Sequence, residues 1–86
     1  MSELDRPVLP PPDKLSLWPV EGGRFGLDAS FSGGFGKAYA KEHRAALRRA
    51  GLKATLRTEG DETSTLRMGP LTADAARISV EAFLGL

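Results

Sequence analysis

Apolar and polar residues alternate along three segments of the chain, and this alternation predicts three β-strands. In residues 24–31 every second side chain is apolar, and residues 52–58 and 65–68 repeat the pattern. A period of two places the apolar side chains on one face of a strand and the polar side chains on the other. The apolar positions expected to build the core on this sheet are Phe25, Leu27, Ala29, Phe31, Leu52, Ala54, Leu56, Leu66 and Met68.

Two segments with helical spacing complete the pattern. We expect the first helix to begin near Phe35 and to stop at Gly51, a residue type favoured just after a helix C-terminus. We expect the second helix to begin after Thr72, a good N-cap, with Asp74 in its first turn. The positions expected to face the sheet are Phe35, Tyr39, His43, Ala46, Leu47 and Ala50 in the first helix and Ala75, Ile78, Ala82 and Phe83 in the second.

The order strand, helix, strand, strand, helix predicts an α+β fold. Both helices must cover the apolar face of one antiparallel sheet, which gives a two-layer sandwich of the ferredoxin-like split βαβ kind. Residues 59–62 are expected to form the hairpin turn between the second and third strands, and the third strand is expected to end at Gly69-Pro70.

The segment before the first strand is expected to add an edge strand. Residues 14–20 have a short apolar rhythm, and Pro19 confines them to an edge because proline cannot donate to a ladder. Glu21-Gly22-Gly23 would then form the hairpin loop into the next strand. We expect Trp18 to lie over the end of the core as a buried anchor.

The domain organisation predicted from the sequence is simple. Residues 1–13 are expected to be a proline-rich flexible tail, and residues 14–86 a single small α+β domain, the size that 86 residues support. No apolar stretch is long enough to cross a membrane and no leader resembles a signal peptide. We therefore expect a cytoplasmic protein with no membrane partner.

The composition limits the chemistry. The chain has no cysteine, which excludes disulfides, thiolate catalysis and Cys-ligated metals. Its one histidine, His43, lies on the apolar side of a helix without an evident partner, so we expect it to be packed in the core. The acidic turn near residues 59–62 lacks the spacing of a calcium loop. We expect a protein that is not an enzyme, with no catalytic residues, no metal site and no cofactor.

Two sets of residues are candidates for binding. Lys37, Lys41, Arg44 and Arg48 follow each other at i, i+4, i+7 and i+11, so they form one basic face of the first helix. That face is either a solvated surface or a site for nucleic acid or another polyanion, although the net charge of +1 is small for a dedicated DNA-binding protein. The second set lies on the uncovered, net basic face of the sheet and comprises Asp28, Ser30, Lys53, Arg57 and Arg67.

The second half of the chain resembles a SPOR domain, a small bacterial fold that binds glycan strands of peptidoglycan stripped of stem peptides. Residues 47–54, LRRAGLKA, are similar to the helix end, glycine and second strand of that family. Residues 67–76, RMGPLTADAA, are similar to its third strand, Gly-Pro turn and alanine-rich second helix. The resemblance covers mainly residues 47–84. It implies a glycan-binding module in which Asp28, Ser30, Arg57 and Arg67 of the open sheet face make contacts.

Three functions remain open at this point. The first is an interaction module that acts through protein–protein contacts, as a subunit or regulator of a larger assembly or as a homodimer formed through a sheet edge. The second is nucleic-acid or polyanion binding through the basic helix face, and the third is SPOR-like glycan binding. The short length, the lack of a catalytic set and the near-neutral charge favour the protein-interaction module.

Overall fold

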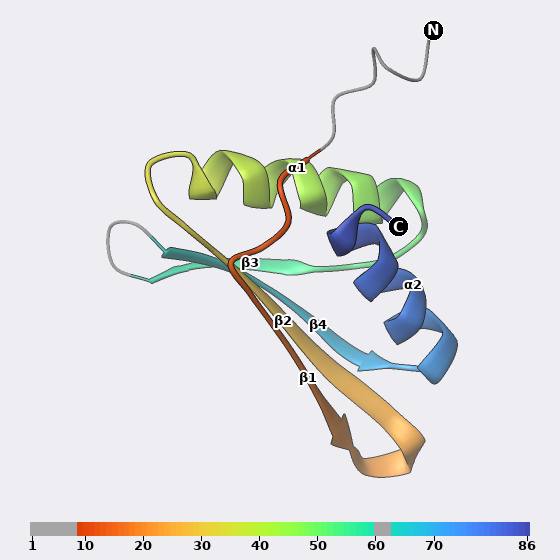
Figure 1. Cartoon of the computed structure of the whole chain (residues 1–86). Helices are drawn as coiled ribbons and strands as arrows, with labels where there is room; N and C mark the ends of the chain where they lie inside the picture. Colours follow the sequence, from red (N-terminus) through yellow and green to blue (C-terminus); the bar gives the residue numbers. More distant parts are fainter. Residues whose placement is uncertain (1–8, 60–62) are drawn as a thin grey trace, which may run out of the picture.

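A computed structural model describes residues 9–59 and 63–86, and it confirms the predicted α+β sandwich (Figure 1). Four strands form one antiparallel sheet in the order β1-β2-β4-β3, with β4 between the two strands that α1 connects. Within the described residues, neither helix has the length and apolar character that a membrane span needs. The elements are β1 (Lys14–Val20), the short 3₁₀ turn η2 (Glu21–Gly23), β2 (Arg24–Ser32), α1 (Gly36–Arg49), β3 (Thr55–Glu59), β4 (Thr63–Leu71) and α2 (Ala73–Leu84).

The expected N-terminal edge strand is confirmed. β1 pairs with β2 along its whole length, from Lys14 opposite Ser30 to Val20 opposite Arg24, and it has no strand on its other side. The turn that joins them needs Gly22, whose φ of 78° lies in the left-handed region that glycine tolerates. This register decides which side chains of β1 share a face with the polar residues of β2.

The other two strands differ from the prediction at their ends. β3 begins at Thr55 rather than at Leu52, and the residues before it reach the core as an irregular connection. β4 continues past the Gly69-Pro70 peptide bond, which is cis, as far as Leu71. It does so because the register shifts, so that two residues of β4 face Gly26 of β2. Residues 60–62 of the expected turn lie outside the described residues.

The buried face of α1 is rotated from the predicted one. The residues that contact the sheet layer are Gly36, Ala40, His43 and Leu47, whereas Phe35 and Tyr39 are exposed. The reason is close approach: a Cβ at Gly36 would lie 2.9 Å from the backbone oxygen of Phe31. Small residues at this contact bring the helix near the strand, and the larger aromatic rings are left on the flank of the helix.

α2 shows a similar shift of about one residue. Its buried positions are Ala76, Ser79 and Phe83, while the predicted Ile78 is 42% exposed and Ala82 is exposed. Ser79 can be buried because its hydroxyl donates to the backbone oxygen of Ala75 at 2.7 Å, which satisfies the polar group. The predicted cap is confirmed, since the Thr72 hydroxyl accepts from the Ala75 amide at 3.1 Å.

His43 is packed in the core, as expected. Its ring lies between Phe31 and Phe83, with centroid distances of 5.1 and 5.4 Å, and it is 3% exposed. Its Nε2 lies 2.7 Å from the backbone oxygen of Pro10, so the segment before β1 satisfies the polar end of the ring. The described end of the predicted tail, residues 9–13, therefore contacts the helix layer (Figure 1).

Asp13 attaches the same segment to β2. Its carboxylate accepts hydrogen bonds from the Ser32 hydroxyl and the Ser32 backbone amide, both at 2.6 Å, and its own amide donates to Ser30. The pKa of Asp13 is lowered below its ordinary value of 3.8, mainly by the hydrogen bond from the Ser32 hydroxyl and to a smaller extent by the one from the Ser32 amide. Because the pKa of Asp13 is lower in the folded protein than in the unfolded chain, its carboxylate stabilises the fold fully at pH values above 3.8. This stabilisation decreases as the pH falls below 3.8.

We predict that Asp13→Asn lowers the free energy of unfolding at neutral pH and that this deficit shrinks as the pH falls through and below 3.8. Urea unfolding of both proteins, from about pH 7 to about pH 2, measures the difference. Ser32→Ala, which removes the hydroxyl donor, should reproduce part of the same pH dependence. A deficit that stays constant with pH would contradict the role given to the carboxylate.

Candidate functional site

Polar side chains from all four strands meet on the sheet face that the helices leave uncovered. Asp28 of β2 lies opposite Arg67 of β4, and the two form a bidentate ion pair with N–O distances of 2.9 and 3.0 Å. On the next rung Ser30 lies opposite Thr65, with their hydroxyl oxygens 3.4 Å apart. Arg57 of β3 extends this rung. The sheet thus brings together four of the five open-face residues predicted from the sequence.

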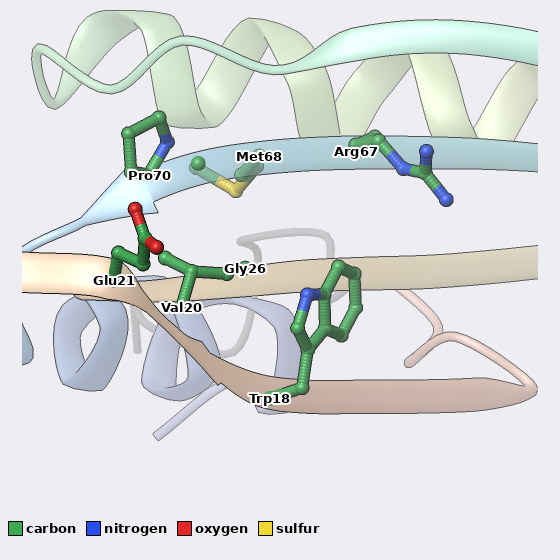
Figure 2. Close-up of a pocket in the computed structure, with 8 residues that line it drawn as sticks. Trp18, Val20, Glu21, Gly26, Arg67, Met68 and Pro70 are labelled. Atoms are coloured by element: carbon green, nitrogen blue, oxygen red, sulfur yellow. The ribbon is translucent and has the colours of Figure 1, made fainter.

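Trp18 belongs to this open face, so the prediction that it covers the end of the core is wrong. It lies opposite Gly26, and its indole occupies the space that a side chain on Gly26 would fill (Figure 2). A Cβ at Gly26 would lie only 2.5 Å from Cε2 of Trp18. The Arg67 guanidinium carbon is 6.0 Å from the centroid of the indole, a cation–π distance. Trp18 therefore lies against a glycine and near a cation.

A hollow of about 480 Å³ lies beside Trp18 on this face. Its walls are mostly apolar, and two charged side chains, Glu21 and Arg67, stand at its border (Figure 2). We call it the Trp18 hollow. It is lined by Trp18, Val20, Glu21, Gly26, Arg67, Met68, Gly69 and Pro70.

The open face around the hollow is basic. Among the described side chains that the four strands place on this face, Asp28 is the one carboxylate, and it forms an ion pair with Arg67. The other cations are spread over three strands, whereas the lining of the hollow itself has one cation, Arg67, and one carboxylate, Glu21 of the turn. The cationic residues on this face are Lys14, Arg24, Arg57 and Arg67.

Lys53 was predicted to share this face, and the structure corrects that placement. It lies in the connection between α1 and β3, before the first strand pair of β3. There it lines a second hollow, of about 490 Å³, together with Arg48, Gly51 and Leu52. Lys53 is therefore a neighbour of the basic helix face rather than of Trp18.

The four basic residues predicted to share one face of the first helix lie in α1. Lys37, Lys41 and Arg48 are exposed and Arg44 is half-buried. Two ion pairs are found among residues 9–59 and 63–86, Arg67–Asp28 and Arg77–Glu81. Neither of them involves a residue of this face. We call these four residues the basic stripe.

The described residues include no group of three or more histidine, aspartate or glutamate side chains that could hold a metal ion. His43, the one imidazole, is buried between two phenylalanine rings and reaches a backbone oxygen rather than a hydroxyl nucleophile. The arrangement on the open face, an aromatic ring, an ion pair and hydroxyl groups around a hollow, is suited to binding a ligand.

Sequence reasoning missed Trp18, Val20 and Pro70 as parts of this surface. A signal was present for Trp18, because it shares the even positions of β1 with Lys14 and Ser16. Once Glu21–Gly23 is taken as the turn, these positions fall on the polar face of the hairpin. No comparable signal indicates Pro70, which reaches the hollow only through the register shift in β4.

No family model, no curated protein and no solved structure matches this chain. The resemblance to SPOR domains stays a prediction that rests on the residues that suggested it.

We predict that Gly26→Ala displaces the Trp18 indole. The added methyl group overlaps the ring, which should cost about 1–3 kcal/mol of stability and shift the emission of this single tryptophan. Urea unfolding and fluorescence spectra measure both effects. In a Trp18→Ala background the same substitution should cost clearly less, and an equal cost in the two backgrounds would contradict the contact.

We predict that Lys37→Glu stabilises the fold. Lys37 lies in the first turn of α1, which has no acidic residue, and one turn before Lys41. A carboxylate there suits the helix dipole and pairs with Lys41 instead of repelling it, which should add about 0.5–1 kcal/mol to the free energy of unfolding. Lys37→Gln, which only removes the charge, should gain less. Destabilisation of the Glu variant in urea would show that Lys37 supports the fold.

Proposed function

We propose that this chain is a small, non-enzymatic interaction module that binds a protein partner through the open face of its sheet. The observation that carries the proposal is the Trp18 hollow, whose walls are apolar and whose border is charged. Residues that dominate protein–protein binding are typically aromatic or arginine side chains in a pocket with a polar rim. Trp18 and Arg67 provide both kinds of side chain at one place.

The charge of the open face supports an acidic partner segment. Lys14, Arg24 and Arg57 lie on the same face of the sheet as the hollow, and Asp28 is already paired with Arg67. Glu21 is the one carboxylate that lines the hollow itself. A partner that inserts an apolar side chain beside Trp18 and carries aspartate or glutamate toward the rung of Lys14 and Arg57 would match both the hollow and the cations beyond it.

A glycan is the second candidate ligand for the same face. Sugar rings have apolar faces that can lie against an indole, and their hydroxyl groups can bond to Asp28 and Arg67. The cross-strand hydroxyls of Ser30 and Thr65 add to this polar set. This alternative is what the resemblance to SPOR domains implies. It differs from the first in salt dependence, because a neutral sugar gains little from the surrounding cations.

The sheet also has two edges, β1 and β3, at which a second copy of the chain could pair. β1 carries Pro19 and β3 has five residues, features that disfavour edge pairing. A homodimer through a sheet edge is therefore a weaker form of the proposed function. The molecular mass in solution, measured by light scattering over a range of concentrations, distinguishes the dimer from a monomeric module.

The first experiment is a selection of random peptides displayed on phage against the immobilised chain. We expect the enriched peptides to share a large apolar side chain flanked by acidic residues. Their binding should change the emission of Trp18 directly, since it is the single tryptophan. Trp18→Ala should weaken binding by about 30-fold or more, the effect of losing an interface hot spot.

The matched control is Ile78→Ala, which truncates a 42% exposed side chain of α2 on the other side of the sheet. It should leave the peptide affinity unchanged, and circular dichroism should show both variants folded. Selected peptides that bind wild type and Trp18→Ala equally well would overturn the proposal. Binding of neutral glycan strands that depends on Trp18, with no peptide enriched, would favour the glycan alternative.

A further inference from the structure

The basic stripe lowers the stability of α1, and the fold itself does not explain why these charges are there. Lys37 lies in the first turn of α1, where the helix dipole disfavours a cation and favours an acidic residue. Lys37 with Lys41, and Arg44 with Arg48, are like-charge pairs one turn apart, and such pairs repel each other. Only Arg48, in the last turn, has a charge that suits its end of the helix.

The stripe also continues beyond the helix. Arg48 lines a hollow of about 490 Å³ at the C-terminal end of α1, and Lys53 lines it too. Leu52 and Gly51 complete that hollow, and no carboxylate takes part in its lining. Five cations therefore follow one another from the first turn of α1 to the connection before β3.

We infer that this row of cations is a binding site for the phosphate backbone of a nucleic acid. From residue 37 to residue 48 the helix rises about 16 Å, at about 1.5 Å per residue. That length corresponds to about five phosphates along one strand of B-DNA, at about 3.4 Å per nucleotide. Evenly spaced lysine and arginine side chains contact phosphates without reading the bases, so the site binds nucleic acid with little sequence preference.

An acidic protein segment is the competing ligand for such a row, and the surroundings favour phosphate. Protein interfaces place aromatic or aliphatic side chains at their centre. Two exposed aromatic residues, Phe35 at the N-cap of α1 and Tyr39 in its first turns, lie on the other flank of the helix, with their rings 6.2 Å apart. The stripe itself contains only cations, which is typical of backbone contacts to a polyanion.

This site is independent of the proposed function. The basic stripe belongs to α1 in the helix layer (Figure 1). The Trp18 hollow lies on the other face of the sheet, with Trp18 and Gly26 in its lining. Trp18→Ala should therefore leave nucleic-acid binding unchanged, and the stripe variants should leave peptide binding at the hollow unchanged. Each proposal can therefore fail in its own binding experiment while the result for the other proposal stays the same.

Fluorescence anisotropy of a labelled single-stranded oligonucleotide with the full chain tests the inference. We expect micromolar binding at about 50 mM salt and a loss of about 50-fold at about 200 mM, the effect of four released counterions on a single strand. Lys41→Glu with Arg44→Glu should abolish binding at the lower salt concentration. Lys37→Glu should weaken binding although it removes repulsion within the helix, so unfolding cannot explain the loss.

The matched pair is Arg48→Glu and Arg49→Glu, which make the same charge change at neighbouring exposed positions of α1. Arg48→Glu should weaken binding and reduce the slope of log affinity against log salt by about 0.7, while Arg49→Glu should keep the wild-type slope. Equal effects of the two variants would overturn the inference, because net charge alone would then account for binding. Absence of binding at low salt would also overturn it, as would equal competition by poly-L-glutamate at matched charge.

Discussion

The contact between Trp18 and Gly26 is the constraint on which the open face depends. The indole fills the space that any other residue of β2 would need at this position. The same rung is tight on its other side, where a Cβ at Gly69 would lie 3.0 Å from the oxygen of Phe25. Two glycines thus let three strands pass close together, and the register shift in β4 then places Pro70 at the border of the hollow. The Trp18 hollow exists because side chains are missing from the middle of the sheet.

The strands and their order follow from the sequence because they depend on a strong and repeated signal. Alternation in β2 is unbroken over nine residues, and one buried face is enough to determine which side the helices cover. The N-terminal edge strand was also predictable, since Pro19 excludes a central position and the Glu21–Gly23 turn fixes its partner. These features are set by residues that lie near one another in the chain.

What could not be predicted depends on contacts between distant residues. The spacing of Phe35 and Tyr39 suggests a buried stripe, but the helix turns Gly36 and Ala40 to the sheet because small residues allow a closer approach. Trp18 was expected to lie over the end of the core as a buried anchor, whereas its place follows from the register that puts it opposite a glycine. Of the candidate binding residues, the strand positions were placed correctly, and Lys53 was misplaced because β3 begins later than its alternation suggests.

The sheet also separates two surfaces of different chemistry. One is a hollow with an aromatic wall on the open face, and the other is a row of cations on the helix layer. The shortest principal extent of the molecule is 18 Å, so ligands on the two faces would lie close together without competing for space. If both proposals hold, a chain with this geometry acts as a thin adaptor: a ligand held on one face keeps the other face close to it. The second encounter then takes place at a raised effective concentration rather than by free diffusion.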